Sequence, residues 1–143
     1  MWAHLLPFRV RMIRVLVVDD QRIFRTAISR SLDAIPGISV VGEASDGSEA
    51  VEKAVHLQPD VVLMDVAMPG INGVDATRRI SEQCPQTQII GLSMHDSSVV
   101  EQMMRRAGAV AYIPKARHLE TLVSTIYEVQ RSDWPEPGGS YWD

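Results

Sequence analysis

Five short apolar runs alternate with five helical patterns along this chain, and that alternation constrains the fold more than any other feature. All five runs contain Val or Ile, and most are apolar nearly throughout, as expected of strands that are covered on both faces. Strands that alternate strictly with helices form a parallel sheet with right-handed crossovers and helices on both sides. The predicted strands are Ile13–Val18, Ile38–Val41, Val61–Met64, Ile89–Leu92 and Val110–Ile113.

The segments between these runs have the helical period, and each has one apolar face. In the fourth segment this face consists of Val100, Met103, Met104 and Ala107. Three helix starts are also predicted, because a capping residue is followed three positions later by an acidic one. These pairs are Asp46 with Glu49, Asn72 with Asp75, and Ser98 with Glu101.

The length of 143 residues is that of one ordinary domain, which can bury a core without disulfides. We predict a folded domain over 12–130, an extension at 1–11, and a tail or the start of a linker at 131–143. The net charge of −4 argues against a nucleic-acid grip by these residues. The single cysteine, Cys84, fits a reducing cytoplasm, and no apolar run approaches the ~20 residues of a membrane span.

Polar side chains follow four of the predicted strands at the point where each strand ends. Asp19 and Asp20 follow the first strand, Asp65 the third, Ser93 the fourth and Lys115 the fifth. Each alone has an ordinary explanation, such as a turn, a helix cap or a solvated charge. The carboxyl ends of parallel strands share one edge of a sheet, where ligands bind, so we expect these side chains to lie together.

Three carboxylates at one edge repel one another unless a cation compensates their charge. Mg²⁺ prefers oxygen ligands and needs only one or two carboxylates plus a phosphate, so the cluster predicts a Mg²⁺ and phosphate site. An aspartate that attacks a phosphoryl donor forms an acyl phosphate, and a lysine stabilises the charge of the transferring group. A carboxylate nucleophile needs no general base.

Four segments of the chain resemble the signature blocks of response-regulator receiver domains, in the same order and spacing over residues 12–130. They are VLVVDDQ, VVLMDVAMPGINGVDATRRI, GLSMHD and AYIPK. The resemblance implies a flavodoxin-like, doubly wound α/β fold with strand order 2-1-3-4-5. It also implies that Asp65 accepts a phosphoryl group from a histidine kinase or a small phosphodonor, and that the domain then controls an output domain or partner.

The resemblance also implies roles for the other residues of the cluster. Asp20 and Asp65 would bind Mg²⁺ directly with the backbone carbonyl of Ala67, while Asp19 would act through metal-bound water. Ala67 brings no polar side chain to a position that often tunes dephosphorylation.

Three further residues follow from the same resemblance. Ser93 and Lys115 would contact the phosphoryl group, and Tyr112 matches the aromatic switch position. Met94 stands after Ser93, where a small residue is common, so its side chain is expected to slow access to the site. Many receivers have a proline after the lysine, where this chain has Ala116.

The Ser-Met-His sequence and the Lys-Ala ending are more similar to the NarL/LuxR subfamily, whose members usually carry a helix-turn-helix output domain. Such a domain is not found in these residues. The expected partners are a histidine kinase and either a second copy of the chain or a downstream output protein, in the cytoplasm. The chain is expected to be a signalling domain that catalyses only its own phosphorylation and dephosphorylation.

Two alternatives stay open from the sequence. A degenerate receiver would act as a constitutive protein-binding module, although all five key positions hold the expected residue types. A haloacid-dehalogenase-like phosphohydrolase also forms an aspartyl phosphate, but it has its nucleophile after the first strand and a second aspartate two residues later.

Overall fold

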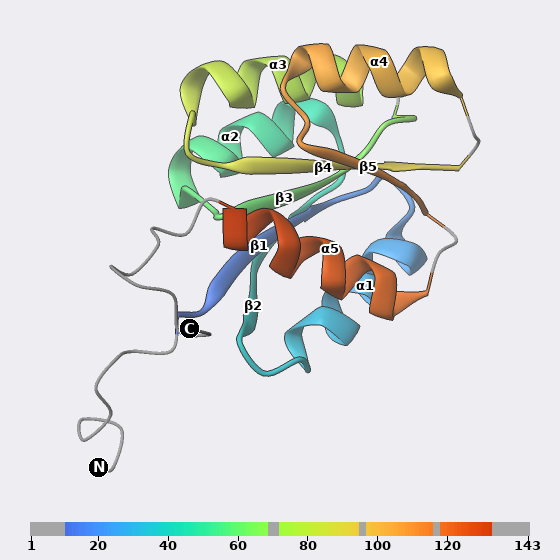
Figure 1. Cartoon of the computed structure of the whole chain (residues 1–143). Coiled ribbons are helices and arrows are strands. Elements are labelled where there is room, and N and C mark those ends of the chain that lie inside the picture. Colours follow the sequence, from blue (N-terminus) through green and yellow to red (C-terminus); the bar gives the residue numbers. More distant parts are fainter. Residues whose placement is uncertain (1–10, 69–71, 95–96, 116–117, 133–143) are drawn as a thin grey trace, which may run out of the picture.

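The computed structural model describes residues 11–68, 72–94, 97–115 and 118–132, which form a five-stranded parallel sheet flanked by five helices (Figure 1). The strand order is β2-β1-β3-β4-β5, which confirms the predicted topology. In chain order the elements are β1 Ile13–Val18, α1 Arg22–Asp33, β2 Ile38–Ala44, α2 Gly47–Leu57, β3 Val61–Asp65, α3 Gly73–Gln83, β4 Gln88–Ser93, α4 Ser98–Ala107, β5 Ala111–Pro114 and α5 Leu119–Ser132.

Helices cover both faces of the sheet, with α2, α3 and α4 on one face and α1 and α5 on the other (Figure 1). The central strand β3 contributes to the core on each side. Val62 and Met64 belong to the apolar cluster under α2, α3 and α4, while Val61 and Leu63 belong to the cluster under α1 and α5. Burial of each such side chain stabilises the fold by about 1.5–3 kcal/mol. Two-sided burial is therefore why the strand sequences are continuous apolar runs.

Several element boundaries differ from the prediction. β2 continues to Ala44 rather than ending at Val41, because the ladder to β1 skips Val41 in a bulge and resumes at Gly42. The predicted cap at Ser98 is wrong: Ser97 is the N-cap of α4, and its hydroxyl accepts from the Val100 N–H. The other two caps are confirmed, since Asp46 accepts from the Glu49 N–H and Asn72 accepts from the Asp75 N–H.

The predicted extension and tail fall mostly on residues 1–10 and 133–143, which lie outside the described residues. Arg11, which the prediction placed in the extension, donates to Asp60 Oδ1 at 2.6 Å. Helix α5 continues to Ser132. Within the described ranges, none of the helices is long and apolar enough to cross a membrane.

The parallel sheet brings the ends of β1, β3, β4 and β5 to one edge. Asp65 is the last residue of β3 and pairs with Leu92, while Ser93 ends β4 and pairs with Pro114. The backbone N–H of Lys115 donates to the Ser93 carbonyl at 2.6 Å, so the chain stays fixed just beyond β5. Backbone pairing thus places the polar side chains that follow these strands.

Candidate metal and phosphoryl site

Three carboxylates converge at this edge, as the sequence predicts. Asp19, Asp20 and Asp65 each offer one oxygen, and these oxygens all lie within 4.8 Å of one another. Asp19 and Asp65 are buried, whereas Asp20 is exposed. This arrangement fits a hard divalent cation, which prefers oxygen ligands and retains water on its open side.

Lys115 is the cation of the cluster, and it is only 5% exposed. Its Nζ lies 2.6 Å from Asp19 Oδ2 and 3.5 Å from Asp65 Oδ2. It also donates to Gln21 Oε1 at 3.1 Å and lies 4.4 Å from the centre of the Phe24 ring. The ammonium is therefore held more closely by Asp19 and Gln21 than by Asp65.

The carboxyl of Asp65 has a raised pKa of about 6, against an ordinary value of 3.8. Burial is the largest cause, and the negative charge of Asp19 is the second. The ammonium of Lys115 and the Ala67 N–H, which donates to Asp65 Oδ1 at 3.2 Å, act in the opposite direction. Near neutral pH the group is still largely ionised, yet it carries a charge that its surroundings do not fully compensate.

The loop between β1 and α1 is held by contacts that the sequence analysis did not identify. The backbone N–H of Gln21 donates to Asp19 Oδ1 at 2.8 Å. Arg25 donates from Nη1 to the Asp19 carbonyl at 2.8 Å and from Nε to Glu43 Oε1 at 3.0 Å. These bonds fix the backbone on both sides of the Asp19 carboxylate.

Ser93 is buried at the end of β4, next to Lys115 in the backbone pairing. Ala67 follows Asp65 by two residues and is exposed, with its N–H turned to the Asp65 carboxylate. The predicted roles of the Ser93 hydroxyl and the Ala67 carbonyl concern a bound phosphoryl group and a metal ion, so they remain predictions.

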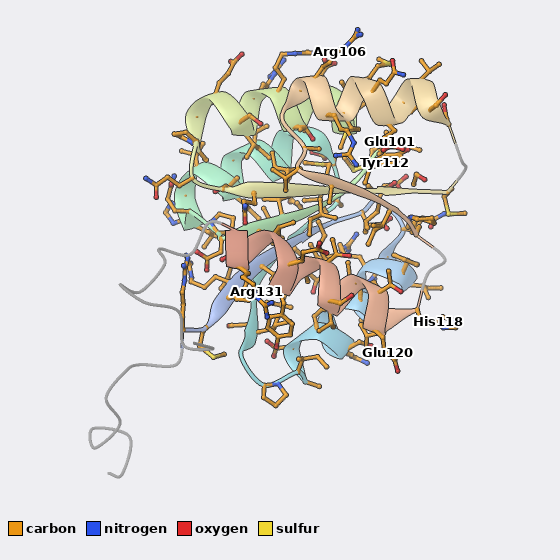
Figure 2. All side chains as sticks on the ribbon, viewed as in Figure 1. Glu101, Arg106, Tyr112, His118, Glu120 and Arg131 are labelled. Carbon is orange, nitrogen blue, oxygen red and sulfur yellow. The ribbon has the colours of Figure 1, made fainter. Side chains whose placement is uncertain are left out.

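Tyr112 lies on β5 on the side that faces α4 (Figure 2). It is partly buried and packs against the apolar cluster under α2, α3 and α4. Its ring lies over Gly91 of the neighbouring strand: a Cβ built on Gly91 would be 2.8 Å from Tyr112 Cδ1 and 3.0 Å from Met104 Cε. Because Gly91 has no side chain, there is room for the aromatic ring. The sequence analysis did not identify this packing contact.

Comparison with known proteins places the chain in a family. The model of the response regulator receiver domain matches residues 15–127. Response regulator GacA of Pseudomonas viridiflava is 44% identical over 115 residues, which are 80% of this chain and 54% of that protein. Response regulator UvrY of Escherichia coli strain K12 is 43% identical over 118 residues, which are 82% of this chain and 54% of that protein.

A solved structure gives the same result. The two-component response regulator of the LuxR family from Aurantimonas sp. SI85-9A1 matches with a TM-score of 0.80 and 33% identity, covering 85% of this chain and 86% of that one. The chain belongs to the response regulator receiver domain family, and its relatives confirm the resemblance to the NarL/LuxR subfamily. It is a signalling domain rather than a classical enzyme, and the two alternatives from the sequence are not favoured. The chain spans about half the length of GacA and UvrY.

Proposed function

We propose that this domain accepts a phosphoryl group on Asp65, assisted by Mg²⁺. The observation that carries the proposal is the convergence of three carboxylates within 4.8 Å of one another, with the Lys115 ammonium 3.5 Å from one oxygen of Asp65. A metal ion and a lysine beside one carboxylate are the groups that an aspartyl phosphate requires, because charge develops on the transferred oxygens.

The geometry favours Asp65 as the nucleophile over its two neighbours. The Oδ2 of Asp19 is already in a 2.6 Å ion pair with Lys115, and its Oδ1 accepts the Gln21 N–H. Asp20 is exposed at the rim. Asp65 ends the central strand, and its Oδ2 lies 3.5 Å from the ammonium, a longer contact than the one that Asp19 makes.

The transfer forms one bond and breaks one bond. A carboxylate oxygen of Asp65 attacks phosphorus, and the bond between phosphorus and the leaving group breaks. The leaving group is the imidazole of a phosphohistidine or the carboxylate of an acyl phosphate. No general base is needed, because the pKa of about 6 leaves most of the Asp65 carboxyl ionised at neutral pH.

The residues present fit Mg²⁺, since buried like charges raise the pKa of Asp65 and a divalent cation would relieve that repulsion. Asp20 and Asp65 would bind the ion directly with the Ala67 carbonyl, and Asp19 would act through metal-bound water. When bound, Mg²⁺ neutralises negative charge on the phosphoryl oxygens. Lys115 then pairs with one phosphoryl oxygen, and Ser93 donates its hydroxyl to another.

Signalling follows from the movement of Ser93 toward the phosphoryl group. That movement vacates space beside β4, and the Tyr112 ring turns inward to fill it. The rearrangement alters the surface formed by α4, β5 and α5. This surface has two conformations, and the charge of the phosphoryl group shifts the equilibrium between them. We propose that a second copy of the chain or an output segment binds this surface.

The partners proposed for the whole protein extend beyond these residues. A histidine kinase in the cytoplasm would supply the phosphoryl group. A DNA-binding output domain is expected if the chain is part of a longer protein of the length of GacA or UvrY, since it spans about half of each. With a net charge of −4, the present residues are not expected to bind nucleic acid themselves.

Phosphorylation by acetyl phosphate with Mg²⁺ tests the proposal. Intact-mass and peptide spectra are expected to show one phosphoryl adduct, on Asp65, which Asp65→Asn removes without loss of fold. Asp46→Asn is the matched control, because asparagine also caps a helix and Asp46 lies outside the cluster. No adduct on the parent would indicate a constitutive binding module, and continuous release of phosphate at high turnover would indicate an enzyme.

A further inference from the structure

The side chain of Gln21 has an unusual placement for a residue that caps a helix. Gln21 is the N-cap of α1, yet its side chain makes no capping hydrogen bond. By contrast, the N-caps of α2, α3 and α4 each accept a backbone N–H of their own helix. The Gln21 amide oxygen instead accepts from Lys115 Nζ at 3.1 Å.

The ammonium of Lys115 has three protons, and among the described residues three side-chain oxygens lie near it. They are Asp19 Oδ2 at 2.6 Å, Gln21 Oε1 at 3.1 Å and Asp65 Oδ2 at 3.5 Å. The Phe24 ring lies against the same group at 4.4 Å. To pair with a phosphoryl oxygen on Asp65, the ammonium must give up or lengthen one of the existing contacts.

Asp19 and Gln21 differ in what frees them from Lys115. With a metal ion at the cluster, the Asp19 carboxylate would also accept from metal-bound water, which would weaken its pairing with the ammonium. Gln21 carries no charge for a metal ion to attract, and as the N-cap of α1 it is held by the helix that follows it. The bond from Lys115 to Gln21 therefore persists until phosphoryl transfer itself draws the lysine away.

We propose that Gln21 is a positioning residue that restrains Lys115 away from Asp65 and so slows phosphorylation. The inference rests on the proposed function of Asp65. The restraint acts on the unphosphorylated state and is released once Lys115 contacts the phosphoryl group. Its removal should raise the rate of phosphorylation and leave the rate of dephosphorylation nearly unchanged, because Lys115 stays on the phosphoryl group throughout the second step.

Two variants separate this role from a structural one. Gln21→Met keeps the length of the side chain but cannot accept the bond, while Gln21→Ser can cap α1 but cannot reach Lys115. Both should phosphorylate about threefold to tenfold faster with acetyl phosphate at saturating Mg²⁺, the range expected for loss of one ordinary hydrogen bond. Arg22→Met, at the neighbouring exposed position, is the control and should match the parent.

A double-mutant cycle with Lys115→Met completes the test, read from the affinity for beryllofluoride with Mg²⁺ by ¹⁹F NMR. The Gln21→Met variant should bind beryllofluoride more tightly than the parent. The same substitution should give no gain in affinity when Lys115 is also replaced by Met. A parent that is labelled on Asp65 while both Gln21 variants match its rate would overturn the inference alone. The same gain in the Lys115→Met background would also overturn it. A parent that takes no label would instead overturn the proposed function.

Discussion

The Tyr112 ring lies over Gly91, where a Cβ would come within 2.8 Å of its Cδ1 atom. The two residues are directly paired across β4 and β5. A backbone with no side chain on one strand thus accommodates the aromatic ring that the proposed mechanism requires to move. The room for the ring depends on Gly91 having no side chain as much as on Tyr112.

We predict that Gly91→Ala destabilises the domain by about 1–3 kcal/mol, the usual cost of overpacking a core. The added methyl group would collide with the ring and with Met104 Cε, which would be 3.0 Å away. In a Tyr112→Ala background the cost should fall to less than half, because the end of a methionine side chain adapts more easily than a ring in a strand pair. Urea unfolding of the four proteins measures this coupling, and equal costs in both backgrounds would contradict the contact.

We predict that Asp20→Ala weakens Mg²⁺ binding by about tenfold or more without unfolding the domain, because Asp20 offers a ligand to the cluster but is exposed. Calorimetric titration with MgCl₂ measures the dissociation constant. Glu52→Ala is the control, since it removes one exposed negative charge from α2 outside the cluster. An unchanged dissociation constant in Asp20→Ala would remove this residue from the proposed metal site.

Much of the fold follows from the sequence because its signals are local. Continuous apolar runs and helical periods reveal which segments alternate, and strand ends with Asp, Ser and Lys indicate which edge carries the chemistry. The end of β2 was missed because Gly42–Ala44 is a weak strand sequence that is held in place by pairing with β1. Of two adjacent serines, only the structure shows that Ser97 is the cap.

The fine structure of the site was not predictable because it depends on tertiary packing. Gln21 and Lys115 are 94 positions apart, and no periodic pattern links them. Phe24 lies on α1, and its contact with the Lys115 ammonium depends on how that helix lies against the sheet. The hydrogen bonds from Arg25 to the Asp19 carbonyl and to Glu43 likewise depend on tertiary packing, because they join a helix to a loop and to a strand.

We predict that Met94→Ala speeds phosphorylation by acetyl phosphate severalfold and leaves stability nearly unchanged. Met94 follows Ser93 at the edge of the site and is 57% exposed, so its side chain adds bulk there with little burial. Rates measured under identical Mg²⁺ and donor concentrations provide the test. Met12→Ala is the matched control. This methionine is 48% exposed and precedes the first residue of β1, so it lies at the edge of the sheet opposite the carboxyl ends of the strands. Equal rates for all three proteins would show that Met94 does not restrict access.

The raised pKa of Asp65 has a consequence for stability whose sign can be derived. Well below pH 3.8, the ordinary pKa, the carboxyl is protonated in both the folded and the unfolded states. Between 3.8 and about 6 the folded protein holds the proton more tightly, so the free energy of unfolding falls as pH rises through this window. Above about pH 6 the free energy of unfolding falls no further on account of this group. The difference in pKa corresponds to a total loss of about 3 kcal/mol for this residue, which is 2% exposed.

We therefore predict that, without Mg²⁺, Asp65→Asn is more stable than the parent by about 3 kcal/mol near neutral pH, because a neutral side chain escapes this loss. The advantage should shrink as pH is lowered toward 4, where the parent carboxyl also becomes neutral. Urea unfolding at several pH values measures it, with Asp46→Asn as the control for removal of one exposed carboxylate. Saturating Mg²⁺ should reduce or reverse the difference, because the ion stabilises the parent by binding its folded state and has one ligand fewer in the variant. A variant that is less stable than the parent near neutral pH without Mg²⁺ would mean that Lys115 compensates the Asp65 charge more fully than the geometry indicates.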